Sequence, residues 1–187
     1  MRYFRKMVGD RLYLSPVNRD DAPLFIEWLN DKAVANPFST YSHMVGSETD
    51  LKWLLEPDSD TQRYAMVLLD GDIMIGCVSL QNIDQLNRNA FLGIFIGEAE
   101  HRSKGYGAEA IRLLLDYGFN TINLHNIMLS VKADNAAGIA CYQKVGFQEV
   151  GRRREWIFKN GHYVDNIYMD ILDREFESVN CSRSDNG

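Results

Sequence analysis

The fold is decided by residues 94–111, IFIGEAEHRSKGYGAEAI, which pass from an apolar strand through a polar loop into a helix. A long amphipathic helix is predicted because apolar residues then recur at helical spacing, at Ile111, Leu114, Leu115, Phe119 and Ile122. Gly105 and Gly107 stand at the start of this helix, where backbone N–H groups have no intrahelical partners. Positions without a side chain let phosphate oxygens approach these amides and the positive end of the helix dipole. With Arg102 and Lys104 adding positive charge nearby, the stretch indicates a pyrophosphate site.

The same glycines fit other interpretations. Gly105-x-Gly107-x-x-Ala110 matches the dinucleotide-binding fingerprint, which also requires an acidic residue about 20 positions further on, after a strand. The next predicted strand, 126–132, ends before Asp134, so no acidic residue stands at that place. A Walker-type phosphate loop is excluded because the sequence contains no Gly-Lys-Ser/Thr. On this motif alone, phosphate binding and a purely structural tight turn both stay open.

The composition is that of an ordinary globular protein. Of the 187 residues, 45% are apolar and 25% are charged. No apolar run approaches the roughly 18 residues of a membrane span, and the charged start is not followed by the apolar stretch of a secretory signal. The net charge of −6 argues against a nucleic-acid-binding protein, whose surface is usually basic.

Three scattered cysteines, Cys77, Cys141 and Cys181, are odd in number and have no paired spacing. This pattern indicates reduced thiols in a cytoplasmic protein rather than a disulfide framework or a metal site. We therefore expect a cytoplasmic protein that binds neither membrane nor nucleic acid, with one domain over residues 1–177. The polar residues 178–187 predict a disordered tail.

The remaining elements are predicted from periodicity, capping residues and turn signals. Strands are expected over residues 11–17, 63–69, 73–83, 90–96, 126–132, 148–159 and 163–172. Helices are expected after Asn18, after the capping box Ser47-x-x-Asp50, and from residues 134–135 to Gly146. Asp70-Gly71 and Asn160-Gly161 are hairpin turn signals, and residues 36–43 read as a loop. This order predicts a mixed α/β fold, with a mostly antiparallel sheet flanked by helices.

Two motifs together resemble the GCN5-related N-acetyltransferases (GNAT). The first is Arg102-x-x-Gly105-x-Gly107, and the second is Asn135-x-x-x-Ile139-x-x-Tyr142-x-Lys144-x-Gly146-Phe147. The resemblance runs from about Arg11 to Leu172 and includes the order of the elements. The closing segment, from Gly151-Arg152-x-Arg154-Glu155 to Met169, is similar to the branch of ribosomal-protein N-terminal and spermidine acetyltransferases. The resemblance implies the GNAT fold, in which two central strands splay apart.

What the resemblance implies for activity is transfer of an acetyl group from acetyl-CoA to an amine acceptor. Strand residues Ile94, Phe95 and Ile96 would pair with the pantetheine arm as an added strand does. Asn135 would hydrogen-bond the same arm. The resemblance is also compatible with a homodimer. The pyrophosphate would be held by the backbone amides of Arg102, Ser103, Lys104, Gly105, Tyr106, Gly107 and Ala108.

Tyr142 is implied as the general acid that protonates the departing thiolate. The alternative is an aromatic residue on a core-facing helix stripe with Ile139. The neighbouring Cys141 is predicted to be a small buried residue, because adjacent residues point to different sides of a helix.

The central strand departs from the family pattern at one position. Relatives in this branch often carry Glu where this chain has Phe91, and a phenyl ring cannot accept the proton of the attacking ammonium. Either a base lies elsewhere, or bulk water deprotonates the acceptor, or the fold no longer catalyses transfer. Candidates for a displaced base are Glu98, Glu100, His101 and Asp84.

The acceptor is the part of the function that the sequence defines least. The polar, little-charged segment 31–46, flanked by helices carrying Trp28 and Trp53, suits a peptide N-terminus or an amino sugar better than a polycation, or is an ordinary surface loop. The run Arg152-Arg153-Arg154 alternates faces on a strand, which favours a solvated edge over an anion-binding patch. Two further alternatives stay open, a polyamine (spermidine) acetyltransferase and a catalytically silent acetyl-CoA-binding module.

Overall fold

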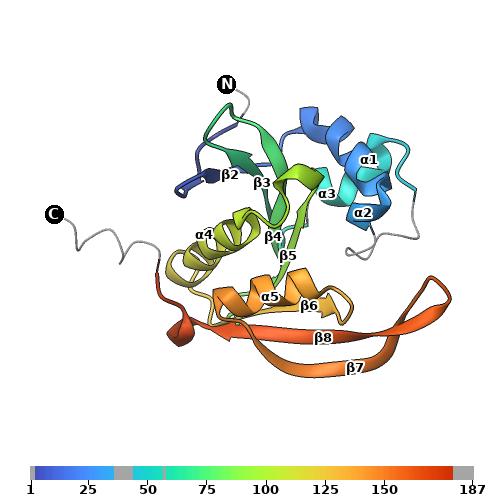
Figure 1. Cartoon of the computed structure of the whole chain (residues 1–187). Coiled ribbons are helices and arrows are strands. Elements are labelled where there is room, and N and C mark those ends of the chain that lie inside the picture. Colours follow the sequence, from blue (N-terminus) through green and yellow to red (C-terminus); the bar gives the residue numbers. More distant parts are fainter. Residues whose placement is uncertain (1–2, 36–43, 57, 179–187) are drawn as a thin grey trace.

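The structure is a computed structural model that describes residues 3–35, 44–56 and 58–178 (Figure 1). Its centre is an eight-stranded sheet in the order β1-β2-β3-β4-β5-β6-β8-β7. Only β5 and β6 pair in parallel among these strands, so the predicted mixed, mostly antiparallel sheet is confirmed. The strands are β1 (Met7–Val8), β2 (Leu12–Pro16), β3 (Gln62–Leu68), β4 (Met74–Asp84), β5 (Asn89–Ile96), β6 (Asn126–Lys132), β7 (Gln148–Lys159) and β8 (His162–Leu172).

Helices cover both faces of the sheet (Figure 1). They are α1 (Ala22–Asn30), α2 (Lys32–Ala35), α3 (Lys52–Leu55), α4 (Tyr106–Asn120) and α5 (Ala136–Val145). Short 3-10 turns occur at Arg19–Asp21, Glu48–Leu51, Ala99–His101 and Asp173–Glu175. None of the helices in the described part of the chain is both long and apolar enough to cross a lipid bilayer.

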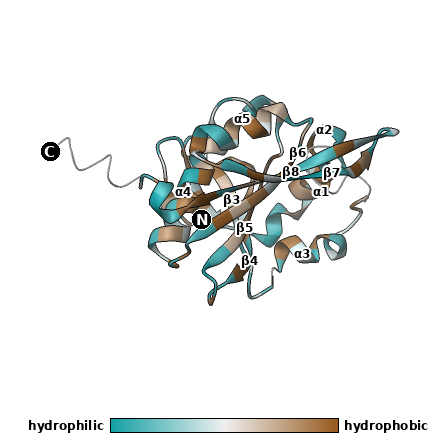
Figure 2. Cartoon of the chain, turned by 90° about the horizontal axis from the view of Figure 1, so that it is seen from below, coloured by the Kyte–Doolittle hydropathy of each residue, from teal (hydrophilic) through white to brown (hydrophobic). Residues whose placement is uncertain are grey.

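Two hydrophobic cores hold the helices to the sheet. On one face, Ile111 and Leu114 of α4 pack with Leu80 of β4, and all three side chains are fully buried. On the other face, Phe25 of α1 packs with Val67 of β3 in a separate cluster. Successive strand residues point to opposite faces, so a strand that is apolar along its whole length contributes side chains to both cores. Figure 2 shows these hydrophobic stretches on the central strands β3 to β5.

Several sequence signals have the geometry that they predicted. Asn160 and Gly161 have φ angles of 51° and 82°, which a tight hairpin turn between β7 and β8 requires. Gly146 ends α5 with φ 119°, and its N–H donates to the carbonyls of Tyr142 and Gln143. The capping box formed by Ser47 and Asp50 is also present, although the helix begins as a 3-10 turn before α3.

Other expectations need correction. Ile122 lies beyond the end of α4 at Asn120. Its N–H donates to the Tyr117 carbonyl five residues back, instead of four as in an α-helix, and Asn123 follows with φ 60°. Asn18 caps the 3-10 turn before α1 rather than α1 itself. The short β1 was not predicted, since two residues are too few to show a period. The loop predicted at 36–43 and nearly all of the tail predicted at 178–187 lie outside the described residues; Ser178, the first tail residue, donates to Asp116.

The two parallel strands β5 and β6 separate along part of their length, which leaves a gap in the sheet. The strands pair only from Asn89–Phe91 to Asn126–Met128. Beyond this point β5 runs on to Ile96 beside β4, while β6 runs on to Lys132 beside β8. Half of the backbone N–H and C=O groups of the separated β5 segment therefore face a gap instead of a neighbouring strand.

Candidate active site

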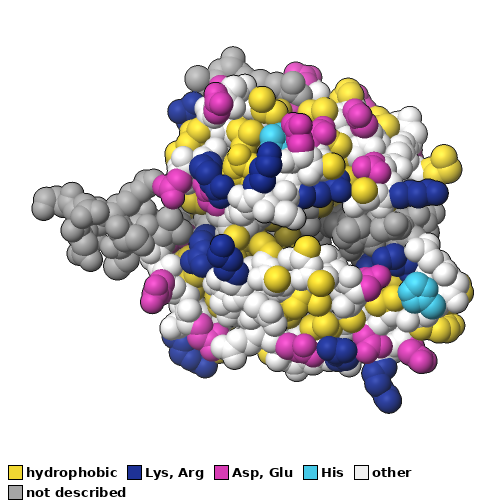
Figure 3. All heavy atoms as spheres, viewed as in Figure 1, with side chains coloured by type: hydrophobic (Ala, Val, Ile, Leu, Met, Phe, Trp, Pro, Cys, Tyr) yellow, Lys and Arg dark blue, Asp and Glu magenta, His cyan; other side chains and the backbone are white. Residues whose placement is uncertain are grey.

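A cavity of about 730 Å³ occupies the gap between β5 and β6. Figure 3 shows the molecule hollowed between the part that carries α4 and the part that carries α5 and β8, with Lys and Arg side chains near both rims. Most of the residues predicted to bind the co-substrate line this cavity, namely Ile94, Phe95, Ile96, Arg102, Ser103, Gly105, Gly107, Ala108, Asn135 and Tyr142. Two predicted residues, Lys104 and Tyr106, do not line it.

The glycine loop ends at the N-terminus of the 15-residue helix α4. Gly105 is the N-cap residue and has φ 85°, a left-handed conformation that favours glycine. The first intrahelical bond of α4 runs from Glu109 N–H to the Gly105 carbonyl, so the amides of residues 106–108 precede it. A Cβ at Gly107 would lie 3.8 Å from Ile96 Cδ1 and 3.7 Å from Cys141 Sγ, inside the cavity wall. The loop is thus shaped to receive an anion at bare backbone amides.

Arg11, the residue just before β2, holds this loop from outside the cavity. Its guanidinium donates to the Lys104 carbonyl at 2.8 Å and lies 4.7 Å from the centre of the Tyr106 ring. It also forms an ion pair with Glu109 at 2.8 Å, and Glu109 accepts from the Arg11 backbone N–H at 2.7 Å. Arg11 thus holds the backbone of the loop at Lys104 and packs on the Tyr106 ring, and the Lys104 and Tyr106 side chains do not line the cavity.

The Arg102 side chain also makes hydrogen bonds within the protein. Its guanidinium donates to the carbonyls of Ile96 and Gly97 at the end of β5, and to the Ala33 carbonyl of α2 at 3.4 Å. The residue therefore ties the loop to β5 and α2. Its charge still lies at the cavity wall, because Arg102 and Lys144 both line the cavity.

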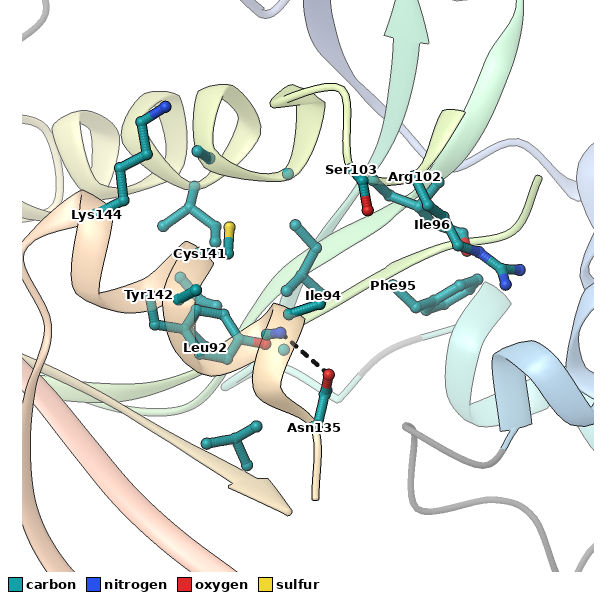
Figure 4. Close-up of a pocket in the computed structure, with 18 of the residues that line it drawn as sticks. Leu92, Ile94, Phe95, Ile96, Arg102, Ser103, Asn135, Cys141, Tyr142 and Lys144 are labelled. Carbon is teal, nitrogen blue, oxygen red and sulfur yellow. Dashed lines mark hydrogen bonds between the residues drawn. The ribbon is translucent and has the colours of Figure 1, made fainter. Parts of the chain in front are cut away.

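Asn135 and Tyr142 are presented by α5, opposite β5 (Figure 4). Asn135 is the N-cap residue, and its Oδ1 accepts from Gly138 N–H at 3.0 Å. A Cβ at Gly138 would lie 2.6 Å from Asn135 Nδ2, so the cap needs a glycine there. With Oδ1 used by the helix, Asn135 has its Nδ2 group to offer a ligand carbonyl.

Tyr142 is half-buried against Phe147, with ring centres 6.1 Å apart. Burial, together with the neighbouring Cys141 thiol, raises the pKa of Tyr142 well above that of a free phenol. The side chain is therefore a neutral hydrogen-bond donor at physiological pH. Cys141 also lines the cavity and is only half-buried, contrary to prediction, because neighbours on a helix are about 100° apart and a wide cavity can reach both.

None of the candidate bases reaches the cavity. Asp84 is bound by the Leu86 and Asn87 amides in the β4–β5 turn, and the Asn87 backbone hydrogen bond lowers its pKa. Glu98 accepts from Trp28 Nε1 at 2.9 Å, and the His101 Nε2 lies 3.2 Å from a Glu100 carboxylate oxygen. Among the described residues that line the cavity there is no Asp, Glu or His. Phe91, which stands where relatives often carry Glu, does line the cavity.

Three polar residues among the described lining residues were not singled out for this role from the sequence. Gln81 of β4 stands opposite Phe91, and its Nε2 donates to Ser79 Oγ at 2.8 Å. The amide lies over Gly93, where a Cβ would come within 2.8 Å of Nε2. Ser130 lies on β6, and Lys144 was quoted only as part of a motif. A signal for Gln81 would have required the register of β4 against β5, which no local pattern supplies.

Groups of three or more His, Cys, Asp or Glu side chains suited to a metal ion do not occur in the described part of the chain.

Comparison with known proteins identifies the family. A family model described as an acetyltransferase (GNAT) domain matches residues 11–148. The N-acetyltransferase p20 of Bacillus licheniformis is 28% identical over 175 residues, which cover 89% of this chain and 96% of p20. The spermidine N(1)-acetyltransferase of Vibrio cholerae is 38% identical over 103 residues, which cover 55% of this chain and 59% of the relative.

The fold agrees with that of solved structures. The crystal structure of the Vibrio cholerae spermidine N-acetyltransferase in complex with CoA and spermine superposes with a TM-score of 0.80 at 29% identity. The match covers 89% of this chain and 98% of that chain. The expected GNAT fold is therefore confirmed, and acetyl-CoA is the expected co-substrate. The chain belongs to the GNAT family of acetyltransferases.

Proposed function

We propose that the protein transfers the acetyl group of acetyl-CoA to a primary amine by direct attack, with Tyr142 as the general acid. The observation that carries this proposal is the opening between β5 and β6, where the Gly105–Gly107 loop, the free side of β5 and Tyr142 line one cavity. These residues fit acetyl-CoA, since bare amides at a helix N-terminus suit its diphosphate and an unpaired strand suits its amide-containing arm. The thioester of acetyl-CoA supplies the acetyl group.

The chain's own residues would orient the thioester and protonate the leaving sulfur. Backbone N–H groups of the separated β5 segment would stabilise the negative charge that develops on the thioester oxygen. Tyr142, kept neutral by burial, would donate its proton to the leaving sulfur. The C–S bond breaks as the C–N bond forms, the attacking nitrogen loses its second proton to solvent, and solvent returns a proton to Tyr142. No protein nucleophile is required. Burial also raises the pKa of the Cys141 thiol, which leaves it a poor nucleophile.

The acceptor amine must lose its proton before it attacks. With no carboxylate or imidazole among the described lining residues, we propose that solvent takes this proton. The acceptor would then react as the small fraction of neutral amine present in solution.

The residues that line the cavity also disfavour a polycationic acceptor. Although relatives include spermidine acetyltransferases, the charged residues that line the cavity in the described ranges are Arg102 and Lys144, which repel ammonium groups. Residues 36–43, which lie outside the described ranges, contain no Asp or Glu in their sequence. We therefore favour a peptide N-terminus or a small-molecule amine over a polyamine.

The test is release of CoA thiol with three acceptors side by side: spermidine, peptides that start with Ser or Ala, and an amino sugar. Wild type and Tyr142→Phe would be compared at saturating acetyl-CoA. We expect turnover with a non-polyamine acceptor and a fall of about 10²–10⁴-fold in kcat for the variant, as for loss of a general acid. CoA affinity, measured by calorimetry, should change little in the variant. A Tyr142→Phe enzyme as fast as wild type would refute the acid role.

Phe91 supports one other candidate function, a catalytically silent acetyl-CoA-binding module. It predicts tight CoA binding with no turnover of any acceptor. Spermidine as the best acceptor would instead overturn our preference among amines.

A further inference from the structure

A second cavity, of about 510 Å³, adjoins the first. Ser130 of β6 lines both cavities. The other walls of the second cavity come from Lys132 at the end of β6, from Asn166 and Tyr168 of β8, and from the β7 residues Arg153, Trp156, Ile157 and Phe158. Figure 1 shows the β7–β8 ribbon extending past the end of β6.

Strand register explains which side chains reach this cavity. Ser130 and Lys132 are two residues apart on β6, and they pair with Tyr168 and Asn166 of β8. Arg153 of β7 pairs with Asn166 in turn. Paired residues share a face of a sheet, so these side chains lie on the face opposite the core residues Leu129 and Val131.

An irregularity in β7 shapes the wall. Arg153 opposes Asn166 and Ile157 opposes Val164, so three residues of β7 stand against Asp165 alone. Glu155 has φ 50° there, and its N–H donates to Asp165 Oδ1 at 2.9 Å. Such bulges bend a strand and re-aim its side chains. The bend accounts for Trp156, a side chain of an edge strand, lining the cavity.

The charged side chains that line this cavity in the described residues are all positive. Lys132 and Arg153 line it, and Asp and Glu are absent among its described lining residues. Lys132 is only 3% exposed, and burial lowers the pKa of its ammonium, with Lys159 acting in the same direction and Asp134 against it. An anion placed beside a buried ammonium restores the stability of its charged form. In a protein with a net charge of −6, a cationic cavity is not a product of general composition.

Arg153 is held in position to receive such an anion. Its guanidinium carbon lies 3.3 Å from the centre of the Trp156 ring, and Nη1 donates to the Tyr168 hydroxyl at 3.4 Å. A planar guanidinium stacked in this way keeps other N–H groups for a carboxylate or phosphate. The nearest acidic residue on the same face of β8, Asp170, accepts from Asn126 Nδ2 at 2.7 Å, away from Arg153 in the register.

We infer that this cavity is the anion subsite of the acceptor, so that the preferred acceptor is an amine carrying a carboxylate or phosphate. The inference rests on the proposed function, because it assumes that the acceptor amine lies in the first cavity near Ser130. Ser130 and Lys132 are about 7 Å apart along the strand, which sets the spacing between amine and anion at about 7–10 Å. The two sources of the anion, an acidic peptide residue and a sugar phosphate, are distinguished by experiment.

The test uses matched acceptors that differ only in charge. Ser-Glu-Gly-amide is compared with Ser-Gln-Gly-amide and Ser-Lys-Gly-amide, and glucosamine 6-phosphate with glucosamine. Rates of CoA thiol release are measured at pH 7.5 and low salt. We expect kcat/KM about 10- to 100-fold higher for the anionic member of at least one series, as for charged hydrogen bonds. A preference in the peptide series points to the carboxylate, and one in the sugar series to the phosphate.

Arg153→Met should abolish this preference. Arg152→Met is the matched control, because Arg152 is the next residue on β7, points to the opposite face and pairs with Glu149 and Asp165. The control should keep the preference. If the neutral acceptors turn over as fast as the anionic ones, or if both variants behave alike, the inference is wrong while the acetyltransferase activity stands.

A binding experiment covers the case in which no acceptor turns over. The CoA-loaded protein is titrated calorimetrically with the same peptides and sugars. Tighter binding of the anionic members to wild type and to Arg152→Met, but not to Arg153→Met, supports the subsite without reference to turnover. Equal affinities, or no binding of any member, overturn it.

Discussion

The pH dependence of the reaction follows from the absence of a base among the described lining residues of the cavity. If solvent deprotonates the acceptor, the rate tracks the neutral fraction of the amine. A peptide N-terminus has a pKa of about 8, so its neutral fraction is about 1% at pH 6, about 10% at pH 7 and about 90% at pH 9. We therefore expect kcat/KM to rise about tenfold from pH 6 to 7 and to level off above pH 8. Tyr142 stays protonated over this range, because burial raises its pKa.

The decisive control changes the acceptor rather than the enzyme. An alkyl amine with a pKa of about 10.4, such as a lysine side chain, should give a rate that still rises tenfold per pH unit up to pH 9. The assay is thiol release at fixed ionic strength, with enzyme stability checked at each pH. An inflection that stays at one pH for both acceptors would show that a protein group takes the proton, and would refute the reasoning.

A base can also be supplied by mutation. Phe91 lines the cavity on β5, opposite Gln81, so a carboxylate at this position would reach the acceptor directly or through water. We expect Phe91→Glu to be at least about tenfold faster at pH 6–7 than the isosteric control Phe91→Gln, with a flatter pH profile. We expect a smaller gain than the roughly 10²–10⁴-fold in rate that a natural general base contributes, because the geometry of an introduced base is not optimised. Equal rates for the two variants would mean that proton removal does not limit the reaction.

Two glycines give predictions that separate binding from folding. Gly107→Val places a branched side chain where a Cβ already lies 3.7–3.9 Å from Cys141, Ile96 and Ile94, so the fold has room for it while the cavity loses space. We expect CoA affinity to fall at least about tenfold, the equivalent of about 1.4 kcal/mol, with a thermal midpoint close to wild type; unchanged affinity would place the diphosphate elsewhere. Gly97→Ala brings a Cβ to 2.0–2.4 Å from the Trp28 ring, which is far inside van der Waals contact. It should lower the free energy of unfolding by about 1–3 kcal/mol, visible as a lower thermal midpoint, and a midpoint equal to that of wild type would show that Trp28 moves at no cost.

Local signals in the sequence predicted most of the elements. Asn160-Gly161 and Gly146 act through backbone conformations that few other residues adopt, so their positions alone defined a hairpin and a helix end. The glycine loop before α4 is of the same kind, because the requirement for bare amides at a helix N-terminus is local. These features, and the family to which the chain belongs, could be predicted from the sequence.

Side chains brought together by strand register could not be predicted. Gln81 stands opposite Phe91 only because β4 pairs with β5 in one register, and Arg153 faces the second cavity only because β7 pairs with β8 in another. The run Arg152-Arg153-Arg154 predicted alternating faces but not what each face meets. The structure shows that the Arg153 face meets Lys132 across β8.

The sequence by itself determined the fold class, the glycine loop, the helix that carries Tyr142 and the replacement of an expected Glu by Phe91, because each depends on residues close together in the chain. Only the tertiary structure decided that Glu98, Glu100, His101 and Asp84 are engaged away from the cavity, and that Arg11, more than 90 residues earlier in the chain, holds the loop. The physical reason is that a side chain's partners are set by packing between elements remote in sequence, which local propensities do not encode.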